Sequence, residues 1–180
     1  LRAINTLKLI QDTLRDNKAP IRAWQLNERH YGELTGLNKD EMRIKLGEDK
    51  IHEFRRSWDI KPSPLSRNNP YHPLNIKAYK EVPREKIPDT ESLKDTYERV
   101  LKYYISDIKT KLVENKNIVI SAHGNSIRAL CKFLFKLNNK EISLLEIPTG
   151  NPLLIELNLK EEIIKCMYLD KDRAKNLLIF

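Results

Sequence analysis

Apolar residues recur at helical spacing at the start of the chain. The first stretch, residues 3–16, predicts an amphipathic helix whose apolar face consists of Ala3, Leu7, Ile10 and Leu14. Residues 21–26 follow a proline and predict a short extended segment. Residues 38–46 and 49–58 predict two further helices. Asn38 is a suitable cap for the second helix, because its side-chain oxygen can accept a hydrogen bond from a free N–H group.

A proline-rich stretch, residues 61–90, separates these helices from the rest of the chain. Its prolines are Pro62, Pro64, Pro70, Pro73, Pro83 and Pro88. Proline cannot continue a helix or a central strand, so we expect a long loop here. Residues 92–116 then predict the longest helix, since Ser92 and Asp95 form a capping-box pattern at its start. Its apolar positions are Leu93, Tyr97, Val100, Tyr104, Ile108 and Leu112.

The last third of the chain alternates strand and helix patterns. Residues 118–120 are a continuous β-branched run, typical of a strand buried on both faces of a parallel sheet. A helix over 126–135 follows, and residues 153–157 and 163–168 predict two strands around a turn at Asn158. This order predicts one α/β domain: a three-layer sandwich with a mostly parallel, mixed sheet flanked by helices.

Composition and charge narrow the class of protein. The chain has 180 residues, of which 40% are apolar and 32% charged, as in a soluble globular domain. Its net charge is +8, but the lysines are interleaved with acidic residues and form no nucleic-acid-binding motif. A small anionic ligand would use local positive charge equally well. Cys131 and Cys166 have no CxxC spacing, which favours buried thiols in a reducing cytoplasm.

The first candidate for chemistry is the turn at residues 123–126, His-Gly-Asn-Ser, which follows the predicted strand 118–120. In an open α/β sheet, ligands bind beyond the carboxyl ends of the strands. A helix that begins there offers free N–H groups to an anion, and His123 can donate a further hydrogen bond. Taken alone, the turn fits a buried, satisfied histidine before an ordinary helix cap equally well.

Two further clusters carry polar function. Residues 27–32 (Asn-Glu-Arg-His-Tyr-Gly) combine a carboxylate, a guanidinium, an imidazole and a phenol, which together can move protons and hold an anion. The alternative is a solvated turn before Gly32. Arg55 and Arg56, with Arg2 and Lys39 as possible companions, can clamp a carboxylate or phosphate, although an arginine pair on a helix is commonly a solvated face.

These clusters belong to a longer series of motifs. After Arg2, Ala3 and Thr6, the series runs through residues 26–32 (LNERHYG), 36–39 (GLNK), 55–59 (RRSWD), 91–96 (ESLKDT), 122–126 (AHGNS) and 147–150 (IPTG). In this order the motifs resemble the cofactor-dependent phosphoglycerate mutases of the histidine phosphatase superfamily. The resemblance extends through nearly the whole chain. Residues 27–32 are its most specific part, because ordinary histidine phosphatases lack them.

The resemblance implies a metal-free, reversible exchange of 3-phosphoglycerate and 2-phosphoglycerate, through a phosphohistidine primed by 2,3-bisphosphoglycerate. It implies that Glu28 is the general acid and base and that His123 stabilises the phosphoryl group in transfer. The substrate-binding residues that it implies are Arg2, Arg29, His30, Tyr31, Lys39, Arg55, Arg56, Gly124 and Asn125. The family's nucleophilic histidine lies in an Arg-His-Gly-Glu motif on its first strand. That motif is absent here, so we expect the first strand and the nucleophile to precede Leu1.

Two positions depart from the family pattern, since Gln25 and Ala78 stand where arginines are common. Either change could shift the balance toward phosphatase activity. The alternatives are therefore a bisphosphoglycerate synthase/phosphatase or other histidine phosphatase, a basic nucleic-acid-binding module, and an inactive partner-binding homologue. The resemblance further implies a cytoplasmic enzyme of glycolysis and gluconeogenesis, a homodimer or dimer of dimers, with no nucleic-acid or membrane partner.

Overall fold

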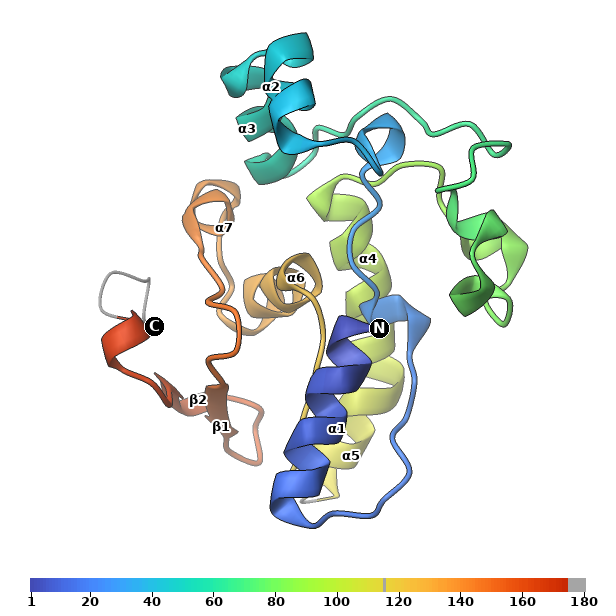
Figure 1. The fold of residues 1–180 in the computed structure, drawn as a ribbon. Helices are drawn as coiled ribbons and strands as arrows, with labels where there is room; N and C mark the ends of the chain where they lie inside the picture. The colour runs from blue at the N-terminus through green and yellow to red at the C-terminus, as the bar shows by residue number, and fades with distance from the viewer. Residues whose placement is uncertain (115, 175–180) are drawn as a thin grey trace.

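The computed structural model describes residues 1–114 and 116–174, except for the side chains of Lys39 and Lys45. Its α-helices are α1 (Arg2–Leu14), α2 (Lys39–Leu46), α3 (Glu48–Arg56), α4 (Leu93–Tyr103), α5 (Lys109–Val113), α6 (Gly124–Leu134) and α7 (Asn139–Leu144). Helices α4 and α6 lie in the middle of the molecule, and α2 and α3 form its upper edge (Figure 1). Among the described residues, no helix is both long enough and apolar enough to cross a membrane.

The local helix signals in the first half of the chain are confirmed. Helices α1, α2 and α3 form within two residues of the ranges predicted for them. The Asn38 side chain accepts a hydrogen bond from the backbone N–H of Asp40 at the start of α2. At the start of α4, Ser92 and Asp95 form both hydrogen bonds of the capping box. A π-helical turn, Tyr104–Ile108, joins α4 to α5, so the predicted long helix is one continuous run with a local irregularity.

The core forms where α4 meets α6 and the segment that follows α6. Its buried cluster comprises Leu93, Cys131, Leu137, Ile142 and Leu145, with Trp58, Ile127, Phe135, Ile147 and Leu153 packed against it. Burial of such side chains is the main favourable contribution to folding, at roughly 25 cal/mol per Å² of apolar surface. Helix α7 contributes Ile142 to this cluster and is a helix that the periodicity analysis did not predict.

The two predicted C-terminal strands are confirmed as β1 (Leu153–Leu157) and β2 (Ile163–Tyr168). They pair in antiparallel fashion, with Leu153 opposite Tyr168. In the connecting turn, the Asn158 side-chain oxygen accepts from the backbone N–H groups of Lys160 and Glu162. The protein is therefore an α/β protein, but the described sheet has two antiparallel strands.

The strand predicted at 118–120 is not formed, and the parallel sheet is not seen in the described residues. Strands β1 and β2 pair only with each other, so the 118–120 segment has no hydrogen-bonding neighbour. Val119 is 58% exposed instead of buried. The extended segment expected at 21–26 is also wrong in part, because Trp24–Leu26 forms a 3-10 turn. Because no strand lies beside this turn, the backbone N–H groups of Leu26 and Asn27 bond to carbonyls three residues earlier in the chain.

The proline-rich stretch contains three 3-10 turns, Pro73–Asn75, Lys77–Tyr79 and Arg84–Lys86, and neither an α-helix nor a strand. Fully buried His72 anchors it: its Nδ1 accepts from the Leu74 N–H, and its Nε2 lies 3.1 Å from an Asp89 carboxylate oxygen. The same stretch passes close to Gly32, which has a positive φ of 54°. A Cβ at Gly32 would lie 2.1 Å from the Ser63 carbonyl oxygen, so only glycine fits there.

Candidate active site

His123 is the residue immediately before α6, and its backbone is extended (φ −103°, ψ 161°). Its side chain is half-buried. Burial lowers the pKa of His123, and the neighbouring charge of Arg2 lowers it further, while Glu28 acts in the opposite direction. The imidazole is therefore neutral around pH 7 and can donate one hydrogen bond. The sequence prediction that His123 lies at the start of a helix is confirmed, although α6 begins two residues earlier than expected.

Asn125 in the first turn of α6 joins two residues of the cluster at 27–32. Its Nδ2 donates to the Glu28 carboxylate at 2.9 Å and to the Tyr31 hydroxyl at 2.8 Å. The same Glu28 oxygen accepts from the backbone N–H of Arg29 at 2.8 Å. The fold thus brings Glu28, Tyr31 and the turn after His123 together from positions almost 100 residues apart in the sequence.

Arg128 sets the orientation of the Asn125 amide and is a residue that the sequence analysis missed. Its Nη1 donates to Asn125 Oδ1 at 3.2 Å, so the amide nitrogen must face Glu28 and Tyr31, because a guanidinium can only donate. Burial lowers the pKa of Arg128 to about 10, with smaller contributions from the charges of Arg56 and Arg29. An arginine three residues after Asn125, and so on the same face of the helix, is the signal that could have identified it.

An open cleft of about 570 Å³ lies beside this group of side chains. Its lining includes Tyr31, Gly124, Asn125 and Arg128 on one side, and Arg43, His52, Arg55 and Arg56 from α2 and α3 on the other. Arg55 is exposed at the end of α3, whereas Arg56 is half-buried and forms an ion pair with Glu146. The cleft wall is rich in arginine, as a site for a small polyanion requires.

Arg29 adds a buried positive charge to the same region. It is 2% exposed, and its Nη2 donates to the Phe54 carbonyl oxygen near the end of α3. Its guanidinium lies 4.4 Å from the centre of the Tyr31 ring. Arg29 Nε and Nη1 have no hydrogen-bond partner among the described residues. Because a buried N–H group without a partner is costly, these donors suit an anionic ligand.

Comparison with known proteins identifies the family. The model of the histidine phosphatase superfamily (branch 1) matches residues 65–169. A 2,3-bisphosphoglycerate-dependent phosphoglycerate mutase of Pelagibacter ubique is 76% identical over the whole chain, which covers 76% of that relative. Mutases of the same name from Maricaulis maris and Borreliella afzelii are 46% and 43% identical over 98% and 97% of the chain, which covers 73% and 71% of their lengths.

The chain belongs to the 2,3-bisphosphoglycerate-dependent phosphoglycerate mutases. The family that the motifs indicate is therefore confirmed. The readings as a nucleic-acid-binding module or as a general histidine phosphatase are not favoured by any of these relatives.

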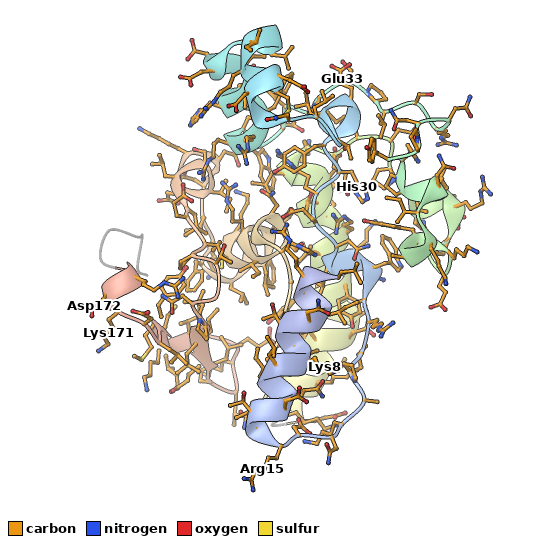
Figure 2. The ribbon with its side chains drawn as sticks, in the orientation of Figure 1. Lys8, Arg15, His30, Glu33, Lys171 and Asp172 are labelled. Atoms are coloured by element: carbon orange, nitrogen blue, oxygen red, sulfur yellow. The ribbon has the colours of Figure 1, made fainter. Side chains whose placement is uncertain are left out.

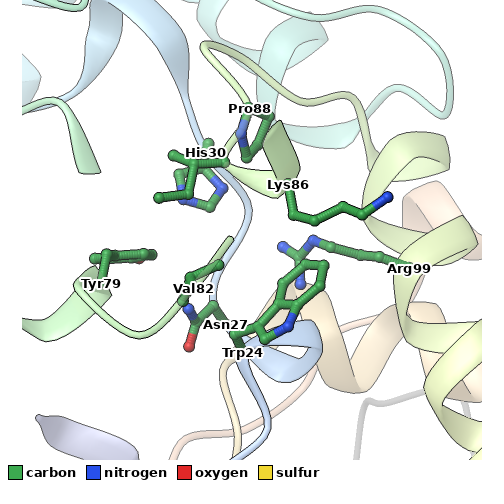
Figure 3. Close-up of a pocket in the computed structure, with 9 residues that line it drawn as sticks. Trp24, Asn27, His30, Tyr79, Val82, Lys86, Pro88 and Arg99 are labelled. Atoms are coloured by element: carbon green, nitrogen blue, oxygen red, sulfur yellow. The ribbon is translucent and has the colours of Figure 1, made fainter. Parts of the chain in front are cut away.

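Of the motif at residues 27–32, Tyr31 is the residue that lines the cleft, and His30 lies away from it. Figure 2 shows His30 among other side chains of the interior, whereas Glu33 reaches the outer edge. His30 lines a cavity of about 10 Å³ with Trp24, Tyr79 and Arg99 among its neighbours (Figure 3). Its Nδ1 lies 2.9 Å from the Glu91 carboxylate. The sequence grouped His30 with the substrate-binding residues, but the structure directs it toward Glu91.

The remaining predicted residues of this mutase differ in how firmly the structure locates them. Arg2 is exposed at the start of α1, close enough for its charge to act on His123. Lys39 begins α2, but its side chain lies outside the described residues. A Cβ added at Gly124 would meet no atom within 4 Å, so the cleft is open at this point. Among the described residues there is no cluster of three His, Cys, Asp or Glu side chains that could hold a metal ion.

Proposed function

We propose that the protein interconverts 3-phosphoglycerate and 2-phosphoglycerate in glycolysis and gluconeogenesis. The observation that carries this proposal is the hydrogen bond from Asn125 to the Glu28 carboxylate beside the arginine-rich cleft. It brings a proton carrier, the turn that follows His123 and an anion pocket into one place. Membership of the mutase family and the 76% identity to a mutase of that name support the same reaction.

Glu28 is proposed to exchange a proton with the substrate hydroxyl. Only one of its carboxylate oxygens receives the hydrogen bonds from Asn125 and from the Arg29 backbone. No hydrogen bond within the described part of the chain reaches the other oxygen, which we propose accepts a hydroxyl group of the ligand. A carboxylate held in this way can act as a base in one direction of a reversible transfer and as an acid in the other.

His123 and Arg2 are proposed to stabilise the phosphoryl group while it moves. Phosphoryl transfer needs mainly positioning and neutralisation of the charge on the equatorial oxygens. A neutral His123 can donate one hydrogen bond to such an oxygen, and Arg2 adds a full positive charge nearby. Metal is not needed for these roles, and we propose that none takes part.

The substrate carboxylate and its second phosphate are proposed to bind between the two sides of the cleft. The residues proposed to contact them are Arg29, Tyr31, Lys39, Arg55, Arg56, Gly124 and Asn125. Partnerless donors on Arg29 and the exposed guanidinium of Arg55 support this assignment. His30 was grouped with these residues, but its bond to Glu91 favours a supporting role.

The nucleophilic histidine is proposed to lie in a segment that precedes Leu1. All three relatives described above are longer than this chain, which covers 71–76% of their lengths. Bound 2,3-bisphosphoglycerate would supply the phosphoryl group that primes that histidine. The unpartnered donors of Arg29 and the cationic side chain of Arg128 fit a ligand with two phosphates and a carboxylate. We further propose a cytoplasmic homodimer or dimer of dimers that takes small phosphorylated glycerates as its ligands.

Turnover of 3-phosphoglycerate by the complete natural protein, coupled to enolase, tests the proposal. It predicts turnover that depends on trace 2,3-bisphosphoglycerate and that is lost in His123→Ala and Glu28→Gln. Release of inorganic phosphate from 2,3-bisphosphoglycerate without turnover would instead assign the protein to the phosphatases. Silence in both assays would indicate an inactive homologue.

A further inference from the structure

Glu91 carries an ionised carboxylate in the interior, outside the cleft. Its side chain is 4% exposed. One oxygen accepts from Arg99 Nε at 2.7 Å, and the other accepts from Arg99 Nη2 at 2.9 Å and from the His30 backbone N–H at 3.0 Å. His30 Nδ1 lies 2.9 Å from the second oxygen. Burial alone would raise the pKa of Glu91, but the hydrogen bonds from Arg99 and His30 outweigh it and lower the pKa to about 2.

Arg99, on α4, also donates hydrogen bonds to the backbone of the segment that contains Glu28. Its Nη1 donates to the Gln25 carbonyl at 2.5 Å, and its Nη2 donates to the Glu28 carbonyl at 3.2 Å. A planar guanidinium can reach three such acceptors at once, whereas a lysine ammonium on a shorter stem cannot reproduce the fork. One arginine thus connects α4 to both ends of the 25–28 segment.

Glu28 is consequently held from two helices. Helix α4 holds its carbonyl through Arg99, and helix α6 holds its carboxylate through Asn125. Ser126 of α6 also donates to the Leu26 and Asn27 carbonyls, which lie 2.8 and 2.9 Å from its hydroxyl. Two residues beyond Glu28, the His30 carbonyl accepts a hydrogen bond from the Glu91 N–H at 2.8 Å, which holds the chain that follows the 25–28 segment. Neither Glu91 nor Arg99 lines the large cleft, but the charge of Arg99 also acts on His123 and lowers its pKa. Arg99→Lys keeps this charge and removes only the forked geometry of the guanidinium.

We propose that Arg99 and Glu91 are positioning residues that hold the Glu28 carboxylate at the distance needed for proton transfer. The inference rests on the proposed acid and base role of Glu28. Misplacement of a reacting group by about 1 Å can lower a rate by roughly 10²-fold. Loss of the hydrogen bonds made by Arg99 and Glu91, here called the clamp, therefore lowers kcat. It leaves KM nearly unchanged, since the arginines of the cleft remain.

A double-mutant cycle in the complete protein tests this inference. Arg99→Lys is expected to lower kcat by about 10- to 100-fold with KM within about threefold. In the Glu28→Gln background, Arg99→Lys is expected to cause no further loss, because its effect passes through Glu28. Arg67→Lys is the matched control: Arg67 is an exposed arginine bonded to Asp89, and its substitution is expected to leave kcat unchanged.

Glu91→Gln provides a second variant, should Arg99→Lys fail to fold. It keeps the size of the side chain and is expected to show the same loss of kcat and the same lack of additivity. Folding of every variant is checked by thermal melting followed by circular dichroism. If Arg99→Lys or Glu91→Gln lowers kcat by the same factor in the Glu28→Gln background as in the parent, the inference is overturned. The proposed role of Glu28 is not affected by that result. Full turnover by Glu28→Gln would overturn the proposed role of Glu28, and the inference with it.

Discussion

The two sides of the cleft are built differently. On one side, Tyr31 and Asn125 line the cleft, and Asn125 donates hydrogen bonds to Tyr31 and to Glu28, which is held by groups from α4 and α6. On the other side, Arg55 is exposed on α3, and Arg56 is half-buried and forms an ion pair with Glu146. Proton transfer requires a fixed geometry, whereas attraction of a polyanion requires mainly nearby positive charge. The difference indicates a fixed side that performs chemistry and an adaptable side that binds the ligand.

The arginine side depends on a small amount of packing. Helix α3 has nine residues and buries only Ile51 and Phe54. The hydrogen bond from Arg29 to the Phe54 carbonyl is a direct connection from α3 to the Glu28 segment. The two sides are therefore linked through one buried arginine, and substitutions on each side should affect different kinetic constants.

The largest effect is expected from removing the charge of Glu28. Glu28→Gln keeps the acceptor oxygen for Asn125 but cannot take up a proton, so kcat should fall by about 10²- to 10⁴-fold while KM stays within a few-fold. Steady-state kinetics of 3-phosphoglycerate turnover give both constants. Glu33→Gln, at an exposed glutamate five residues away, is the control and should behave as the parent. A large rise in KM alone would assign Glu28 to the binding side.

The stability of the folded protein in acid tests the ion pair between Glu91 and Arg99, which supports the fixed side of the cleft. The pKa of Glu91 is about 2 in the folded protein and 4.5 ordinarily, so the stability that it contributes is fully present above about pH 5 and is lost as the pH falls toward 2. The contribution amounts to about 3 kcal/mol. Urea unfolding between pH 7 and pH 3 should show a shallower decline in stability for Glu91→Gln than for the parent. Glu98→Gln, at an exposed site on α4, should retain the parent slope.

A smaller effect is expected from the adaptable side. Arg55→Ala removes one charge-assisted contact and should raise the KM for 3-phosphoglycerate by about tenfold, with kcat within about threefold. The effect should shrink as salt is added, since exposed charges are screened. Arg15→Ala, at the end of α1 and remote from the cleft, is the control (Figure 2). A fall in kcat as large as that of Glu28→Gln would contradict the division into two sides.

The smallest effect is expected at Glu146. This residue lines the cleft and pairs with Arg56, but both side chains are at least 30% exposed, so the pair contributes about 0–1 kcal/mol. Glu146→Gln frees Arg56 for the ligand and should lower KM by up to about threefold. Steady-state kinetics of 3-phosphoglycerate turnover measure this change, and a higher KM is the opposite result. Weaker binding would mean that Glu146 helps to hold Arg56 in place for the ligand.

Local signals in the sequence predicted elements well where neighbours were not needed. The Ser92 capping box and the two C-terminal strands were predictable, since a side-chain bond to a nearby N–H and a two-strand hairpin are local features. The prediction of a strand at 118–120 was wrong because a strand also needs a paired neighbour. Helix α7 was missed because its six residues are too few to show clear periodicity.

The site was predictable only in part. Glu28 and His123 stand in recognisable motifs, and the structure brings them within electrostatic reach of each other. Arg99, Arg128 and Glu91 were not predicted as site residues. Each acts through contacts with residues that are distant in the sequence or hidden on a helix face. Such roles depend on how α4 and α6 pack, which the pattern of single residues does not reveal.

The most direct test of the account is a crystal structure of the complete protein with 3-phosphoglycerate bound. The account predicts a ligand hydroxyl within about 3 Å of the free oxygen of the Glu28 carboxylate. It also predicts that the ligand's carboxylate or phosphate contacts Arg55 and Arg56. A ligand bound elsewhere, or one whose hydroxyl groups all turn away from Glu28, would contradict it.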